Sequence, residues 1–327
     1  MTMEYVKLGR SNLKVSRLCL GAMGFGSKSW RDWVLNEKAS APIVDRAIEH
    51  GINFFDTCDF YSAGESERIL GETLVKKHQR DSFVLATKAG NPMSAHPNGR
   101  GYSRKHLFRA IDDSLHRLGT DHVDLFQTHI WDKSCELEEL VDAMGDIVRA
   151  GKARYVGVTT MPAWTLALCR SIAETKNSAK FLSMQCEYNA THRECERELV
   201  PLCLHENIAL IPFSPMARGF LSADRRDKAN NSARTASDDY TQKYYYRDSD
   251  FAVQSALADI AARMECSPSQ VALAWTLSRP GMTSPIFGAT SVAQLDEAAA
   301  ALDLKLTQDD IATIDAAYAP RPFGGGH

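Results

Sequence analysis

The chain of 327 residues is predicted to adopt an α/β fold, a closed (β/α)8 barrel of the TIM-barrel type. Apolar segments rich in β-branched and aromatic residues alternate with segments of helical periodicity, which indicates a parallel sheet. Eight strand–helix units follow one another, and the chain is long enough for one barrel. Several strand segments end in a polar residue, which is where barrel enzymes carry their catalytic groups.

The first half of the chain is divided into elements by turn residues and hydrophobic periodicity. Gly9-Arg10-Ser11-Asn12 is a turn signal, so residues 5–17 are expected to form a small hairpin ahead of the barrel. Ser103 is a favourable N-cap for a helix that Gly119 ends. Strands are expected at 18–21, 53–56, 83–87 and 123–128, and helices at 40–50, through 69–75, at 103–118 and at 137–150.

The second half continues the alternation and adds helices. A polar stretch without clear periodicity, residues 216–249, is expected to be a lid or cofactor-binding loop. The tail at 320–327 is expected to be flexible, and residues 1–327 to form one domain. Strands are expected at 154–160, 181–188, 209–215 and 285–288, and helices at 162–176, 194–206, 250–265, 268–279, from 291 onward and at 307–318.

An open, doubly wound sheet is the competing architecture. It would require a glycine-rich turn between an early strand and a helix. The segment from Gly21 to Gly26 is rich in glycine, but a tryptophan-containing loop follows it instead of a helix. The closed barrel is therefore favoured.

Composition and charge argue against several classes of protein. A formal net charge of −3 gives no basic footprint for nucleic acid, and no apolar run is long enough to span a membrane. The N-terminus lacks the features of a secretory signal, and none of the eight cysteines forms a C-x-x-C pair, so free thiols in the cytoplasm are expected. The ten histidines form no H-E-x-x-H motif, so no structural metal is expected.

Four residues near the ends of three successive strand segments are candidates for catalysis. Asp56 ends one strand and Tyr61 follows it, while Lys88 and His129 close the next two strands. A tyrosine, with an ordinary pKa of about 10, can protonate a developing alkoxide, and a lysine at ~4 Å would lower that pKa. Asp56 would neutralise Lys88, and His129 would hydrogen-bond the substrate oxygen. This set suits reduction of a carbonyl group.

Each of these residues also has a structural interpretation when taken alone. The aspartate could cap a loop, the tyrosine could be a packing residue, the lysine and aspartate could form a structural pair, and the histidine could be a satisfied core residue. Their placement together at neighbouring strand ends favours the catalytic interpretation.

The chain resembles the aldo-keto reductase superfamily over essentially its whole length. The resemblance lies first in the segment 51–57 (GINFFDT) with Tyr61, which contains one of the four candidates and precedes another. Within the superfamily, the chain looks most similar to bacterial stand-alone reductases. The other matching segments are 85–88 (LATK), 121–129 (DHVDLFQTH), 151–158 (GKARYVGV), 184–185 (MQ), 212–219 (PFSPMARG) and 288–297.

The resemblance implies a (β/α)8 barrel that reduces aldehydes and ketones with NADPH, reversibly. Position by position, it implies that Tyr61 is the general acid and that Asp56, Lys88 and His129 support it. The implied partner is a small carbonyl or alcohol substrate.

The resemblance also implies a cofactor site. Phe213 matches the aromatic residue that stacks on the nicotinamide ring, and Gln185 matches the residue that binds its carboxamide. The segment 214–219 matches the pyrophosphate contacts, in agreement with the phosphate site common to barrels. The implied cofactor-binding residues are Gly21, Met23, Asp56, Thr159, Thr160, Gln185, Phe213, Ser214, Pro215, Met216, Arg218, Gly219, Gly288, Thr290, Gln294 and Glu297.

Three departures from the family pattern concern the cofactor. Thr159-Thr160 replaces the usual Ser-Asn, Thr290 stands where the family often has a basic residue, and Ala298 replaces a common Asn. The 2′-phosphate of NADPH would then be met by hydroxyls, by helix amides or by basic side chains elsewhere. NADP is expected and NAD is possible. The candidate basic residues are Arg218, Arg225, Arg226 and Lys228.

Aromatic residues in loops are candidates for the substrate pocket, although each could equally be ordinary loop packing. An aromatic wall would favour apolar or aryl carbonyls. The candidates are Trp30, Trp33, Phe60, Tyr61, His129, Trp131 and the run Tyr244–Tyr246.

Two other functions compete with the reductase. The first is an NADP-binding regulatory or sensor protein on the same barrel, with little turnover, against which the four intact candidate positions argue. The second is a metal-dependent barrel hydrolase, which would need ligand clusters that the sequence does not show.

Overall fold

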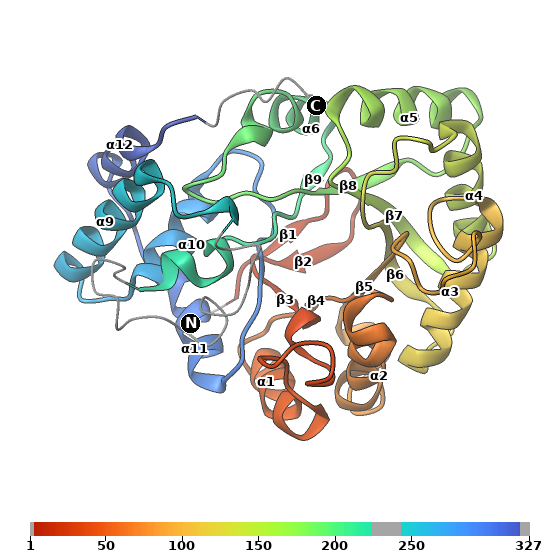
Figure 1. The fold of residues 1–327 in the computed structure, drawn as a ribbon, viewed down its shortest axis with the longest axis horizontal. Helices are drawn as coiled ribbons and strands as arrows, with labels where there is room; N and C mark the ends of the chain where they lie inside the picture. Colours follow the sequence, from red (N-terminus) through yellow and green to blue (C-terminus); the bar gives the residue numbers. More distant parts are fainter. Residues whose placement is uncertain (1–2, 224–242, 321–327) are drawn as a thin grey trace.

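The protein is built around a ring of eight parallel strands, seen in a computed structural model that describes residues 3–223 and 243–320. The strands lie in the order β10-β3-β4-β5-β6-β7-β8-β9, and helices surround them (Figure 1). Parallel bridges from Leu210 to Met282 and from Phe213 to Ile286 join the two ends of this order. The predicted (β/α)8 barrel is therefore confirmed.

The elements follow the predicted alternation, after the antiparallel hairpin of β1 (Tyr5–Lys7) and β2 (Lys14–Ser16). The barrel strands are β3 Cys19–Gly21, β4 Phe54–Asp56, β5 Val84–Ala89, β6 Val123–Thr128, β7 Ala153–Thr159, β8 Phe181–Gln185, β9 Ala209–Leu210 and β10 Ile286–Phe287. The helices are α1 Glu37–Glu49, α2 Glu65–Leu70, α3 Arg104–Leu118, α4 Leu137–Arg149, α5 Ala163–Thr175, α6 Leu199–Glu206, α9 Asp248–Arg263, α10 Pro268–Ser278, α11 Val292–Ala300 and α12 Gln308–Ala317.

Side chains alternate along the strands between the barrel interior and the layer beneath the helices. In β5, Val84 and Ala86 belong to a small inner cluster, whereas Leu85 packs into the large cluster that includes the helices. Leu8 and Val15, beside or in the hairpin strands, join the inner cluster, so the hairpin closes the amino end of the barrel. The opposite, carboxyl end is left open for polar side chains.

Several element boundaries differ from the predictions. β8 ends at Gln185 and β9 at Leu210, so both strands are shorter than expected. Beyond β9, the chain keeps only single bridges such as Glu187 to Phe213. The expected helix through 69–75 changes to a π-helical turn at Gly71, whose missing side chain lets it lie against the backbone carbonyl of Leu118.

The predicted lid and tail fall mostly outside the described residues. Of the loop expected at 216–249, residues 224–242 lie outside, and of the tail expected at 320–327, residues 321–327 do. In the described part of the loop, Ala217–Ser222 forms a 3-10 turn and α9 begins at Asp248.

The N-cap of α3 provides a test of the local folding signals. The Ser103 hydroxyl accepts a hydrogen bond from the His106 amide at 3.3 Å. We expect Ser103→Ala to lower the free energy of unfolding by about 1 kcal/mol, because one helix amide loses its partner. Urea unfolding followed by circular dichroism measures the change. Ser171→Ala, at an exposed site inside α5, is the control and should have an effect below about 0.5 kcal/mol. An equal effect of both variants would contradict the capping role.

Candidate active site

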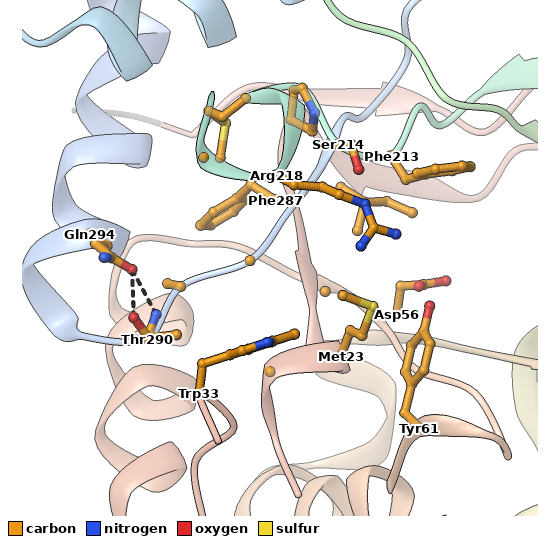
Figure 2. Close-up of a pocket in the computed structure, with 18 of the residues that line it drawn as sticks. Met23, Trp33, Asp56, Tyr61, Phe213, Ser214, Arg218, Phe287, Thr290 and Gln294 are labelled. Atoms are coloured by element: carbon orange, nitrogen blue, oxygen red, sulfur yellow. Dashed lines mark hydrogen bonds between the residues drawn. The ribbon is translucent and has the colours of Figure 1, made fainter. Parts of the chain in front are cut away.

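A cavity of about 850 Å³ opens where the barrel strands end. Strand-end residues such as Gly21, Asp56 and Gln185 line its floor. Figure 2 shows Asp56 and Tyr61 on one side of the cavity and Thr290 and Gln294 on the other. This elongated arrangement brings together residues that are far apart in the sequence.

Most of the predicted site residues line this cavity. Lys88 is fully buried and does not line the cavity itself. Its ammonium is paired with Asp56, which does. Trp131 is not among the described lining residues; its half-buried side chain packs against the helix-side core instead. The predicted residues that do line the cavity are Gly21, Met23, Trp30, Trp33, Asp56, Phe60, Tyr61, His129, Thr159, Thr160, Gln185, Phe213, Ser214, Pro215, Met216, Arg218, Gly219, Gly288, Thr290, Gln294 and Glu297.

The predicted tyrosine run lies elsewhere. Tyr245 is 1% exposed and stacks on Phe220, and its hydroxyl donates to Glu187. Tyr244 and Tyr246 are exposed and are not among the described lining residues. The idea that this run forms a pocket wall is therefore wrong, because the central tyrosine anchors the chain to the core. The candidates Arg225, Arg226 and Lys228 lie outside the described residues.

A buried ion pair forms the floor of the cavity. Lys88 Nζ donates to Asp56 Oδ1 and, at 2.8 Å, to the carbonyl oxygen of Thr57. Asp56 Oδ2 accepts from Nε2 of Gln127 and Nε2 of Gln185, both at 3.2 Å. Burial alone would lower the pKa of Lys88, but the Asp56 carboxylate, together with the nearby Tyr61 and Cys58, raises it overall. Lys88 therefore keeps its positive charge beside the Asp56 carboxylate.

Gln127 was missed as a site residue, although its position could have revealed it. Residue 125 points into the barrel, so residue 127, two positions further along β6, must do the same. A polar side chain that points inward at a strand end needs a polar partner. Asp56 is that partner, and Gln127 completes its hydrogen bonding.

Tyr61 lies beside the ion pair, at the start of a turn with left-handed backbone at Ser62 and Ala63. The Lys88 ammonium is 5.2 Å from the centre of its ring, and the His129 ring contacts it edge-to-face at 5.6 Å. Burial raises the pKa of Tyr61 above its ordinary value, and Lys88 offsets only part of that increase. Lys88 therefore lowers this pKa in the expected direction, but desolvation of the phenolate has the larger effect. The phenol keeps its proton.

His129 is neutral, and its surroundings favour one tautomer. Burial, with the nearby Lys88 ammonium, lowers the pKa of His129 to about 3. Its Nδ1 atom lies 2.5 Å from Asn91 Nδ2 and 3.3 Å from Cys58 Sγ. Burial raises the pKa of the Cys58 thiol well above its ordinary value, so the thiol keeps a hydrogen to donate. Because Nδ1 faces two donors, it accepts, and the ring hydrogen belongs on Nε2.

The turn after β9 is shaped to receive an anion. Ala217, Arg218 and Gly219 all have positive φ angles, a left-handed run of the kind that can turn successive amides toward one point. Arg218 extends into the cavity toward the side where Asp56 and Tyr61 lie (Figure 2). Opposite this turn, the amide and hydroxyl of Thr290 donate to Gln294 Oε1 at 2.8 and 3.0 Å. An elongated ligand with phosphate groups fits between these elements.

Comparison with known proteins identifies the family. The sequence profile of the aldo/keto reductase family matches residues 17–319. The chain belongs to the aldo/keto reductase family. It is therefore an oxidoreductase, and the functional class expected from its motifs is confirmed.

The aldo/keto reductase relatives are fungal. A versiconal hemiacetal acetate reductase from Aspergillus parasiticus is 39% identical, with 99% of each chain covered. An aldo-keto reductase from Fusarium vanettenii is 35% identical over 98% of this chain and 93% of its own, and one from Metarhizium robertsii is 36% identical with the same coverage. The expected likeness to bacterial reductases is therefore not supported; sequence motifs shared by the whole superfamily do not distinguish its branches.

Two further observations describe this reductase. No helix in the described ranges is long and apolar enough to cross a membrane. Among those same residues, no three His, Cys, Asp or Glu side chains are grouped so that they could hold a metal ion.

Asp59 provides a test of the electrostatics under the site. It is 1% exposed, and neither carboxylate oxygen has a hydrogen-bond partner among the described residues. Burial, with the Glu67 carboxylate, raises the pKa of Asp59 to about 8. The unfolded chain, with a pKa of about 3.9, releases this proton far earlier. Between these two pKa values, the folded protein holds one more proton, so Asp59 destabilises it increasingly as pH rises.

We therefore expect Asp59→Asn to be more stabilising at pH 8 than at pH 5, since asparagine does not titrate. Urea unfolding at both pH values measures the difference in the free energy of unfolding between variant and wild type. Asp81→Asn, at an exposed position, is the control and should show no such pH dependence. A difference that is the same at both pH values would contradict the raised pKa of Asp59.

The His129 tautomer can be tested by an isosteric change at its neighbour. In Asn91→Asp, a carboxylate replaces the amide beside Nδ1, so we expect the hydrogen to move to Nδ1 and the pKa of His129 to rise. Nitrogen-15 NMR of the histidine rings measures both quantities. Asn98→Asp, which adds the same charge at an exposed position, should leave His129 unchanged. An unaltered His129 spectrum in Asn91→Asp would refute the assignment.

Proposed function

We propose that this reductase catalyses the reversible, NADPH-dependent reduction of an aldehyde or ketone to an alcohol, with Tyr61 as the proton donor. The observation that carries the proposal is the group formed by Tyr61, neutral His129 and the buried Asp56–Lys88 pair at one side of a single cavity. A protonated phenol and an imidazole N–H beside each other form a pair of donors suited to an oxygen on which negative charge develops.

Each residue has a separate task in this proposal. A bound nicotinamide cofactor supplies the hydride. Tyr61 and Nε2 of His129 hydrogen-bond the carbonyl oxygen, and Tyr61 transfers its proton as the oxygen becomes an alkoxide. Lys88 stabilises the phenolate that remains, since its ammonium is close to the Tyr61 ring. Asp56 holds Lys88 in place and balances its charge.

The cavity lining supports a dinucleotide as the cofactor. Phe213, which lines the cavity, would stack on the nicotinamide ring, and Gln185, whose amide donates to Asp56, would bind its carboxamide. The left-handed turn at 217–219 would bind the pyrophosphate. We propose NADP over NAD because Arg218 and Thr290 line the cavity, where they could contact a further phosphate, and Arg225, Arg226 and Lys228 are further candidates.

The substrate end of the cavity is aromatic. The Trp30 ring lies 6.3 Å from both the Phe60 ring and the Tyr61 ring, next to the proposed proton donor. We therefore propose an apolar or aryl carbonyl compound as the substrate. The relative named for reduction of versiconal hemiacetal acetate supports an organic carbonyl or hemiacetal of this general kind.

The site of action is proposed to be the cytoplasm. All eight cysteines are free thiols, which suits a reducing compartment. The proposed partner is the small-molecule substrate.

Replacement of the phenol tests the proposal. We expect Tyr61→Phe to lower kcat by roughly 10²-fold or more, because the variant lacks the proton donor. Fluorescence titration should show an NADPH dissociation constant close to that of wild type, and tighter binding of NADPH than of NADH to both proteins. Steady-state rates with a panel of aldehydes and ketones give kcat. Tyr5→Phe, which removes a phenol hydroxyl from an exposed residue of the hairpin outside the cavity, is the control and should retain most of kcat. Wild-type kcat in Tyr61→Phe would refute the acid, and NADPH binding without turnover of any carbonyl would instead indicate a regulatory protein.

A further inference from the structure

Arg31 is a cation in the cavity that none of the proposed roles uses. It follows Trp30 in the loop between β3 and α1, and it lines the cavity. Its guanidinium carbon lies 4.6 Å from the centre of the Trp30 ring and 5.7 Å from that of Trp33. Two indoles therefore position this side chain.

The hydrogen-bonding edge of Arg31 forms no side-chain hydrogen bond within the described part of the chain. A guanidinium that stacks on an aromatic face can still donate in its own plane to a carboxylate. No carboxylate among the described residues forms an ion pair with Arg31, whereas many other arginines of the chain, such as Arg46 and Arg117, do form such pairs. Arg31 is thus held in place but has no anionic partner among the residues that the structure describes.

The charge balance of the cavity favours an anion beside Arg31. The Asp56 carboxylate is neutralised by Lys88, and Glu297 accepts a hydrogen bond from Ser269 at 2.5 Å. Neither carboxylate forms a pair with Arg31, so its positive charge is not balanced from within the lining. A negatively charged ligand group would balance it.

Arg31 and the proposed proton donor, Tyr61, share a neighbour in the cavity. Trp30, which supports Arg31, is also the residue whose ring lies 6.3 Å from the Tyr61 ring. The guanidinium and the proposed proton donor therefore both lie near the same indole. A substrate of the size of an aromatic aldehyde can place its carbonyl group at Tyr61 and a second group, at its far end, against Arg31.

We propose that Arg31, stacked on Trp30 and Trp33, is a binding site for a carboxylate carried by the carbonyl substrate. The substrate class is thereby an aldehyde or ketone that is also an acid, and this inference rests on the proposed function. The same chemistry, an anionic oxygen group, also occurs in the phosphates of the cofactor. The experiment separates these two sources.

The test compares two aldehydes of similar shape, 4-carboxybenzaldehyde and its neutral methyl ester. Wild type should reduce the acid with the higher kcat/KM. Arg31→Gln should lower kcat/KM for the acid by roughly 10- to 100-fold, the loss expected when a charge-assisted hydrogen bond is removed, with little change for the ester. The NADPH dissociation constant should not change. Arg31→Lys, which keeps the charge but not the fork of donors, should lose less.

Arg109→Gln is the matched control, because its side chain is 80% exposed on α3 and it removes the same charge away from the cavity. An equal loss for acid and ester in Arg31→Gln, or an equal effect of Arg109→Gln, would overturn the inference. Weaker NADPH binding in Arg31→Gln would assign Arg31 to the cofactor phosphates and would also overturn it.

Benzoate binding to wild type, with benzamide as the neutral comparison, tests the same site without turnover. Tryptophan fluorescence should report benzoate binding that Arg31→Gln weakens, and equal binding of benzoate and benzamide would overturn the inference. If neither aldehyde reacts but benzoate binds through Arg31, the proposed reduction fails and the anion site stands.

Discussion

The buried pair of Lys88 and Asp56 is the interaction on which the candidate site depends. A charged ammonium and a charged carboxylate inside a barrel are costly unless every charge is matched and every polar atom is bonded. Here the Thr57 carbonyl, Gln127 and Gln185 supply the remaining partners. These contacts come from four different strands or strand ends, so the pair exists only in a closed barrel.

The same ion pair influences the protonation of its surroundings, together with burial. Its ammonium helps to keep His129 neutral and partly offsets the effect of burial on Tyr61. The result is a group of uncharged hydrogen-bond donors that faces the cavity above a paired charge. The two cationic side chains of the lining, Arg31 and Arg218, belong to different loops. In our proposals, one binds the substrate anion and the other the cofactor.

Most of the fold could be predicted, because the alternation of side chains along a strand and the capping of a helix depend on residues that are close in sequence. Ser103 caps α3 as expected, α11 begins next to Ser291 as expected, and inward-facing positions follow from alternation along each strand. The strand ends beyond Gln185 and Leu210 could not be predicted, because pairing there depends on how the neighbouring loops separate at the cavity mouth. Tyr245 and Trp131 were misplaced for a related reason: an aromatic residue in a loop can face a cavity or the core, and periodicity does not distinguish the two.

The sequence by itself determined the class of the protein, the order of its elements and the identity of the four candidate catalytic residues, since these are carried by short motifs and by the period of the strands. Only the tertiary structure decided which neighbours those residues contact and how deeply they are buried. The raised pKa of Tyr61, the Nδ1 contacts of His129 with Cys58 and Asn91, and the stacking of Arg31 on two indoles depend on burial and on neighbours distant in sequence. Desolvation and hydrogen-bond partners are properties of the packed chain, which no local pattern contains.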